Sequence, residues 1–169
     1  TMASSISTTK KNWVKESHDP LCFHLTSKKY SYLSNFYTSF FLDPKTDKVF
    51  ASIEACFQAY KFENRPDACA LMENFASLTN SLQAHYLGSK KRMPMTYDEE
   101  IEWLNGKRVD VMHHALCLKF GQNDRLRDRL LDTGNKVLIS KESKSKGSKG
   151  DDFWGVKNNV GANVLGQLL

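Results

Sequence analysis

The spacing of apolar residues changes from strand-like to helical about one third of the way along the chain. Apolar and polar residues alternate over residues 21–25, as in a strand with one buried face. Residues 37–42 and 48–51 flank residues 43–47, a segment with Pro44 and two aspartates that favours a turn. This arrangement predicts an edge strand followed by a β-hairpin.

After the hairpin the apolar residues recur at helical intervals. Ser52 is a suitable N-cap for a helix that ends near Asn64, because Pro66 disfavours a helical conformation of the residue before it. Asn105-Gly106 interrupts the longest helical pattern. We predict further helices ending at residue 72, then over residues 77–87, 98–120, 124–131 and 163–168, with a short strand at residues 137–139.

These elements predict an α+β fold, mostly helical, with a small β-sheet. Neither an internal repeat nor a linker divides the chain, so we expect one domain over residues 21–169. The polar residues 1–20 are expected to be a flexible tail, and Asn123 is expected to cap the helix that follows it.

Composition narrows the class of protein. The sequence is 40% hydrophobic and 11% aromatic, which argues against disorder. No run of about 18 apolar residues and no signal-peptide core is present. We expect an intracellular protein of the cytoplasm or nucleus, monomeric and without a membrane partner.

The cysteines and histidines show no metal-binding spacing. Adjacent His113 and His114 point in different directions on a helix, so we expect neither a metal nor another cofactor. No Cys-x-x-Cys pair occurs, and reduced, buried thiols are expected. The cysteines are Cys22, Cys56, Cys69 and Cys117.

The net charge of +5 comes largely from one basic segment, residues 141–149, in which lysines alternate with serines and glycines. Such a segment is either a solvated loop or a loop that attracts phosphate groups or a nucleic acid backbone. No known motif for reading RNA or DNA accompanies it.

One helical stripe combines three kinds of polar group. Glu54, Gln58 and Lys61 are spaced i, i+4 and i+7, so they share a face of the helix. A carboxylate, an amide and an ammonium group in one row suit binding of a sugar hydroxyl or a phosphate. The alternative is an ordinary ion pair on a solvated face.

Three other segments carry candidate ligand-binding residues. Trp154, in a loop rich in Gly and Asp, is either an aromatic wall for a planar base or a plug over the core. Asn163 begins a helix whose free N–H groups could bind an anion. Lys119 ends an apolar helix, where it interacts with the helix dipole or with a phosphate. Asn35 either binds a ligand or forms a turn.

In this order, these segments resemble the YbiA-like, or NADAR, family over roughly residues 30–169. The matching segments are Leu33-Ser34-Asn35-Phe36, Ser52-x-Glu54-x-x-Phe57-Gln58-Ala59-x-Lys61-Phe62, Val111-Met112, Lys119-Phe120-x-Gln122-Asn123, Leu130-Leu131-x-Thr133-Gly134, Asp151-x-x-Trp154-Gly155 and Gly161-x-Asn163-x-Leu165-Gly166. The sequence departs from the family pattern at Ser140, where an acidic residue is common, although Glu142 follows closely.

The resemblance implies a cofactor-free N-glycosidase. Members resemble enzymes that cleave ribosylamine intermediates of riboflavin synthesis or enzymes that remove ADP-ribose from guanine in nucleic acid. We expect removal of ADP-ribose from guanine bases in DNA. The alternatives are action on riboflavin intermediates, or a non-catalytic module that binds ADP-ribose or NAD.

The resemblance and the chemistry together assign roles to residues. Glu54 or Asp151 is expected to stabilise the positive charge that develops on ribose during cleavage. Lys61 offers a second route, through a Schiff base with the sugar. The residues expected to bind substrate are Asn35, Phe36, Gln58, Lys119, Asn123, Trp154, Gly155, Asn163 and Gly166.

Overall fold

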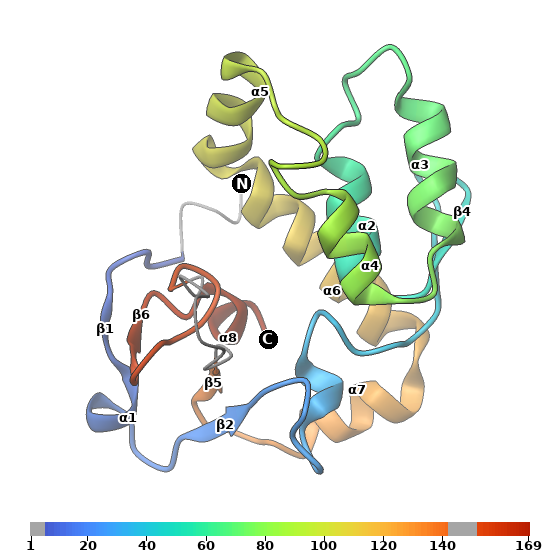
Figure 1. Cartoon of the computed structure of the whole chain (residues 1–169). Coiled ribbons are helices and arrows are strands. Elements are labelled where there is room, and N and C mark those ends of the chain that lie inside the picture. The colour runs from blue at the N-terminus through green and yellow to red at the C-terminus, as the bar shows by residue number, and fades with distance from the viewer. Residues whose placement is uncertain (1–5, 142–151) are drawn as a thin grey trace. The chain divides into compact units, whose positions relative to one another are not determined.

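The computed structural model of the chain describes residues 6–141 and 152–169 (Figure 1). These residues form two compact units. The first unit is contiguous and spans residues 35–124, and the second combines the chain segments on either side of it. Because the second unit is assembled from both ends of the chain, no linker in the sequence reveals it.

The predicted hairpin is confirmed in the first unit. Strands β3 (Phe41–Asp43) and β4 (Lys48–Phe50) pair in antiparallel fashion, with Phe41 opposite Phe50. Both phenylalanines are buried, whereas Leu42 and Val49 lie on the exposed face. The hairpin therefore has one face in the core, as the alternation of a half-buried strand pair requires.

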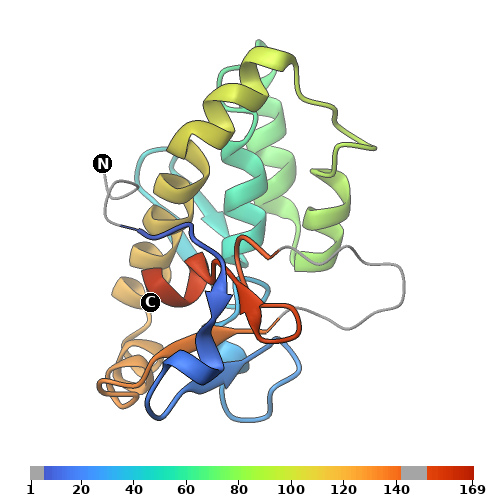
Figure 2. The same cartoon turned by 90° about the vertical axis from the view of Figure 1, so that its left-hand side faces the viewer.

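Helix α2 (Ile53–Tyr60) is the central helix of the first unit, and all of its residues are buried. Ser52 is its N-cap, as predicted, and accepts a hydrogen bond from the Ala55 N–H at 3.2 Å. Around it pack α3 (Ala68–Ser77), α4 (Ser81–Leu87) and α6 (Arg108–Gln122), as Figures 1 and 2 show. Because α2 is completely buried, the polar side chains on it are expected to form hydrogen bonds within the fold.

The longest helical pattern is interrupted where the sequence predicts it. Segments α5 (Tyr97–Glu102) and η3 (Trp103–Lys107) precede α6, and Gly106 has a φ of 120°. This conformation is one that glycine adopts readily. Trp103 is buried, whereas Ile101 and Leu104 are exposed.

A fully buried carboxylate joins the hairpin turn to two helices. Asp43 accepts hydrogen bonds from the Tyr60 hydroxyl, from His114 Nε2 at 3.1 Å and from the Lys45 backbone N–H at 3.1 Å. Burial alone raises the pKa of the Asp43 carboxyl, but the hydrogen bonds from Tyr60, Lys45 and His114 outweigh it and hold the pKa below its usual value. Burial and the contact with Asp43 raise the pKa of the Tyr60 hydroxyl.

Asp43→Asn is therefore expected to destabilise the protein by roughly 3 kcal/mol, because the amide offers one acceptor atom to several donors. The lowered pKa means that the ionised carboxyl stabilises the fold above its unfolded-state pKa, and that this stabilisation is lost as the pH falls through the folded-state pKa. The difference in urea midpoint between wild type and variant should shrink below about pH 4. Asp47→Asn, in the same turn, is the control, and an equal effect there would contradict this role of Asp43.

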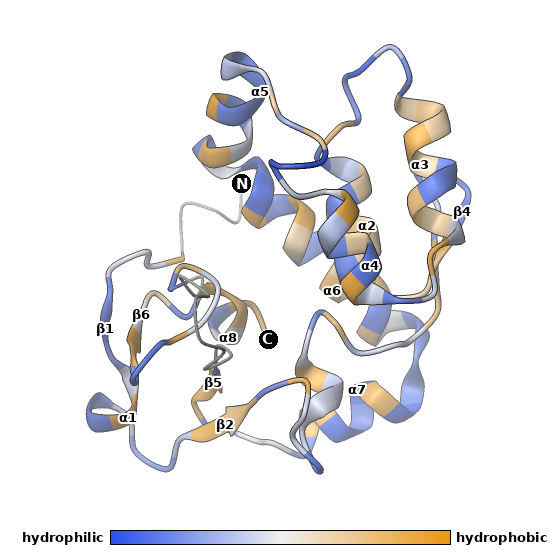
Figure 3. Ribbon diagram, in the orientation of Figure 1, coloured by the Kyte–Doolittle hydropathy of each residue, from blue (hydrophilic) through white to orange (hydrophobic). Residues whose placement is uncertain are grey.

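The second unit contains short elements from both ends of the chain. Strand β2 pairs in parallel with β5, with Cys22 opposite Ile139, and β1 pairs in antiparallel fashion with β6. In α7 polar residues predominate between leucines (Figure 3), and Leu126 is buried. The elements of this unit are β1 (Lys11–Asn12), α1 (Trp13–Glu16), β2 (Leu21–Phe23), η2 (Ser31–Leu33), α7 (Asp124–Leu131), β5 (Leu138–Ser140), β6 (Val160–Gly161) and α8 (Val164–Leu168).

The prediction of a flexible tail over residues 1–20 is wrong for residues 11–16. Lys11 pairs with Gly161, and Trp13 is buried with Ile139 and Val156. The Trp13 indole N–H donates to the Gly161 carbonyl at 2.8 Å. Strand β1 has only two residues, and its partner β6 lies far from it in the sequence. The local pattern of polar residues therefore does not predict it.

The cysteines are free thiols, but only Cys56 is buried, so the prediction of four buried cysteines is wrong. Cys117 lies on the exposed side of α6, although its neighbours in the sequence are apolar. No helix within the described residues is both long enough and apolar enough to cross a membrane.

Candidate functional site

A buried carboxylate lies at the centre of the candidate site, in the first unit. Glu54 Oε2 accepts a hydrogen bond from Asn35 Nδ2 at 2.6 Å. Glu54 Oε1 accepts one from Gln58 Nε2 at 2.8 Å and lies 2.8 Å from His85 Nδ1. The Glu54 side chain is only 4% exposed. An ionised carboxylate only accepts hydrogen bonds, so all three neighbours act as donors and His85 carries a proton on Nδ1.

Two backbone contacts fix the partners of Glu54. The Glu54 N–H donates to the Asn35 carbonyl at 3.0 Å, which holds the first turn of α2 against this segment. The Ser81 hydroxyl donates to the Phe36 carbonyl at 2.8 Å, and the Phe36 ring lies 5.5 Å from that of His85. The start of α4 and its last turn are thus both attached to residues 35–36.

Lys61 lies at the other end of the predicted stripe. Its Nζ donates to the Gly88 carbonyl at 2.7 Å. Burial lowers the pKa of the Lys61 amine, and the nearby charge of Glu54 opposes this shift. At a given pH, a larger fraction of Lys61 is therefore in the neutral form, which is the nucleophilic one, than for an exposed lysine.

Gly88 is needed for the packing of Gln58. A Cβ at position 88 would lie 2.1 Å from Gln58 Oε1. That oxygen is buried and has no hydrogen-bond partner among the described residues. Because an unsatisfied buried acceptor is costly, it is suited to a donor supplied by a ligand, such as a sugar hydroxyl.

Lys119 is fully buried on α6. Its Nζ lies 5.3 Å from the centre of the Tyr37 ring and 5.2 Å from that of Phe120. Burial lowers the pKa of the Lys119 amine to about 7. Asn123 Nδ2 donates to the carbonyls of Lys119, at 2.8 Å, and Phe40, at 3.2 Å. Asn123 is thus the C-cap of α6, and its predicted contact with substrate stays a prediction.

The predicted site residues near the C-terminus belong to the second unit. Asn163 is fully buried; its Oδ1 accepts from the Ser140 N–H at 2.9 Å and its Nδ2 donates to the Leu138 carbonyl at 2.9 Å. A Cβ at Gly166 would lie 2.1 Å from that same carbonyl. These two residues hold α8 against β5, and their predicted contact with substrate stays a prediction.

The indole of Trp154 lies edge-on to the Phe153 ring at 5.0 Å and is partly exposed, whereas Gly155 is buried. The Gly155 carbonyl accepts a hydrogen bond from the Asn163 N–H at 3.2 Å. Asp151, Glu142 and most of the basic segment lie outside the described residues. The predicted roles of Asp151 and Glu142 therefore remain predictions from the sequence.

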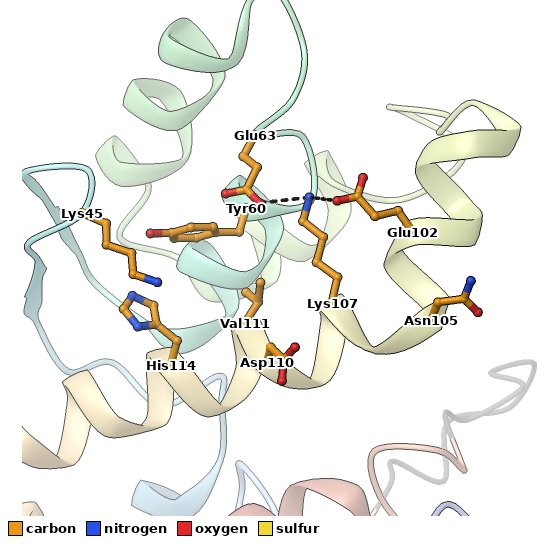
Figure 4. A pocket seen from close by; sticks show the side chains of 9 residues that line it. All are labelled: Lys45, Tyr60, Glu63, Glu102, Asn105, Lys107, Asp110, Val111 and His114. Carbon is orange, nitrogen blue, oxygen red and sulfur yellow. Dashed lines mark hydrogen bonds and ion pairs between the residues drawn. The ribbon is translucent and has the colours of Figure 1, made fainter. Parts of the chain in front are cut away.

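A pocket of about 640 Å³ opens on another side of α2 (Figure 4). Lys107 lies between Glu63 and Glu102, at 2.9 and 3.0 Å, so its ammonium group forms ion pairs with both carboxylates. Tyr60, which lines the pocket, is six positions from Glu54 and faces away from the Glu54 stripe. The described residues contain no group of three or more His, Cys, Asp or Glu arranged to hold a metal.

This geometry defines a class: a mostly helical α+β protein in which one helix carries a buried carboxylate and ends at a partly buried lysine amine. A family model described as the NADAR domain matches residues 22–169, and the chain belongs to that family. The NMR structure of the Escherichia coli protein YbiA has the same fold, with a TM-score of 0.70 and 27% identity, over 89% of this chain and 81% of that one.

Three relatives carry functional names. A protein named N-glycosidase from Nostoc punctiforme is 29% identical over 73% of this chain and 72% of its own length. The chloroplastic riboflavin biosynthesis protein PYRR of Zea mays is 28% identical over 70% of this chain, and a riboflavin biosynthesis protein of Vibrio vulnificus is 31% identical over 89%. The chain spans only 18% and 36% of the length of these two proteins.

Proposed function

We propose that this protein is an N-glycosidase that cleaves ribosyl or ADP-ribosyl N-glycosidic bonds. One observation carries the proposal: α2 carries the Glu54 carboxylate, which three donors hold, and ends at Lys61, its C-cap, whose amine belongs to the same stripe. The family membership and the name of the Nostoc relative support the same reaction class.

The geometry favours a covalent route through Lys61. The Glu54 carboxylate already accepts hydrogen bonds from three donors, whereas Lys61 Nζ donates to the Gly88 carbonyl and lies 5.6 Å from the centre of the Phe62 ring. When the sugar is attached to an exocyclic amine, its ring can open to an imine at C1′. Lys61 then attacks C1′, the original amine leaves, and water hydrolyses the new imine. The negative charge of Glu54 stabilises the cationic intermediates.

We propose ADP-ribose on guanine in DNA as the substrate. Guanine provides the exocyclic amine that the covalent route requires. The basic residues Lys90, Lys91 and Arg92 begin two positions after Gly88, and the Arg92 guanidinium lies 4.7 Å from the centre of the Tyr86 ring. An exposed Lys91 beside a stacked cation and an aromatic ring is typical of surfaces that bind a phosphate backbone.

The test is incubation of the protein with DNA that carries guanine-linked ADP-ribose, with chromatographic detection of free ADP-ribose. We expect release by wild type and its loss in Glu54→Ala. Absence of release by wild type would contradict this choice of substrate.

The names of the maize and Vibrio relatives favour a second candidate, the ribosylamine intermediates of riboflavin synthesis. The same assay with those intermediates separates the two substrates. Binding of ADP-ribose or NAD, measured as a thermal shift without product from either substrate, would instead indicate a non-catalytic module.

A further inference from the structure

His85 is the exposed member of the buried Glu54 cluster. Its side chain is 59% exposed, whereas that of Glu54 is 4% exposed. Gln58 is buried, and Asn35 has an amide, which does not exchange protons near neutral pH. Among the three donors to Glu54, His85 is therefore the one that can both contact a substrate and transfer a proton.

The orientation of the imidazole is set by two contacts. Nδ1 lies 2.8 Å from Glu54 Oε1, and the Phe36 ring packs 5.5 Å away at 60°. Because the carboxylate fixes the proton on Nδ1, the atom that gains and loses a proton is Nε2. A carboxylate that orients an imidazole in this way is the arrangement used for general acid–base catalysis.

The position of His85 relative to Lys61 also fits a shared reaction. His85 lies in the last turn of α4, and the next residue after that helix, Gly88, accepts the hydrogen bond from Lys61 Nζ. The charged groups that α2 presents toward this end of α4 are Glu54 and Lys61. On α4 itself, Tyr86 is the neighbouring titratable residue.

We infer that His85 is the proton-transfer residue of this site and that Glu54 is the residue that positions it; this assignment rests on the proposed N-glycosidase function. Lys61 Nζ forms a bond to C1′; as the bond from C1′ to the leaving nitrogen breaks, its electron pair goes to that nitrogen, which takes the Nε2 proton of protonated His85. Water then adds to C1′ and gives one proton back to Nε2, and the bond from C1′ to Lys61 Nζ breaks with its electron pair returning to the amine. The imidazole thus returns to its starting state, and the net reaction consumes one water.

The experiment compares wild type, His85→Ala and His85→Gln on DNA carrying guanine-linked ADP-ribose. We expect kcat to fall about 100-fold in both variants, with little change in KM. The wild-type limb of the pH–rate profile between about pH 5 and 8 should disappear. Because the ring is exposed, added imidazole should restore turnover to His85→Ala, in proportion to the concentration of its protonated form.

His113→Gln, on α6, is the matched control and should behave as wild type. Turnover of both His85 variants within about twofold of wild type, or an unchanged pH profile without rescue by imidazole, would overturn this assignment and leave the N-glycosidase function intact. Absence of release by wild type from both DNA and riboflavin intermediates would overturn the proposed function, and the role of His85 with it.

Discussion

Lys61→Arg is expected to lower turnover by about 10⁴-fold or more, since the variant loses the nucleophile of the covalent route. Arginine keeps the positive charge and can still donate to the Gly88 carbonyl, which accepts from Lys61 at 2.7 Å. It cannot form an imine with C1′. A large loss in this variant would therefore reflect the missing amine and not a missing charge.

The covalent intermediate can be detected directly. Borohydride added during turnover should reduce the imine and attach the sugar permanently to Lys61, which peptide mass spectrometry can locate. The control is Lys45→Arg, which replaces an exposed lysine in the hairpin turn. This variant should show wild-type turnover and wild-type labelling of Lys61. Near-wild-type turnover in Lys61→Arg would exclude the imine and favour direct hydrolysis.

Glu54→Gln is expected to lower kcat by about 1,000-fold. Glutamine removes the negative charge beside the cationic intermediates. It also has one acceptor oxygen, whereas Asn35, Gln58 and His85 supply three donors. At least one donor loses its partner, so the imidazole loses its fixed orientation together with the charge.

Part of this loss could come from unfolding, so the measurement pairs steady-state kinetics with thermal unfolding of the same samples. Glu63→Gln is the matched control, because Glu63 pairs with Lys107 outside the cluster. A Glu54→Gln variant that remains folded and retains more than about one tenth of wild-type kcat would show that the carboxylate is not required.

Local sequence rules predicted the features that depend on short-range geometry. The stripe of Glu54, Gln58 and Lys61 follows from the helical period alone, and the Ser52 cap and the Gly106 kink follow from backbone preferences. Each of these depends on residues within one or two turns of a helix, which is the range over which sequence patterns are informative.

Features that depend on tertiary packing could not be predicted in this way. His85 is 31 positions from Glu54, and nothing in its own helix marks it as a partner of that carboxylate. Asn163 has the sequence of a helix start, but its backbone is left-handed, with a φ of 53°, and its amide bonds to β5. Its role is decided by a strand more than 20 residues earlier.

The discontinuous second unit has a consequence for synthesis on the ribosome. Strand β2, near the N-terminus, pairs with β5, and β1 pairs with β6, close to the last residue of the chain. Residues 35–124, by contrast, contain Asn35, Gln58 and His85, the donors to Glu54 described above. During translation the Glu54 cluster can assemble before β5 and β6 are synthesised. Until then β1 and β2 lack the strands that pair with them, and Trp13 lacks Ile139 and Val156, which bury it.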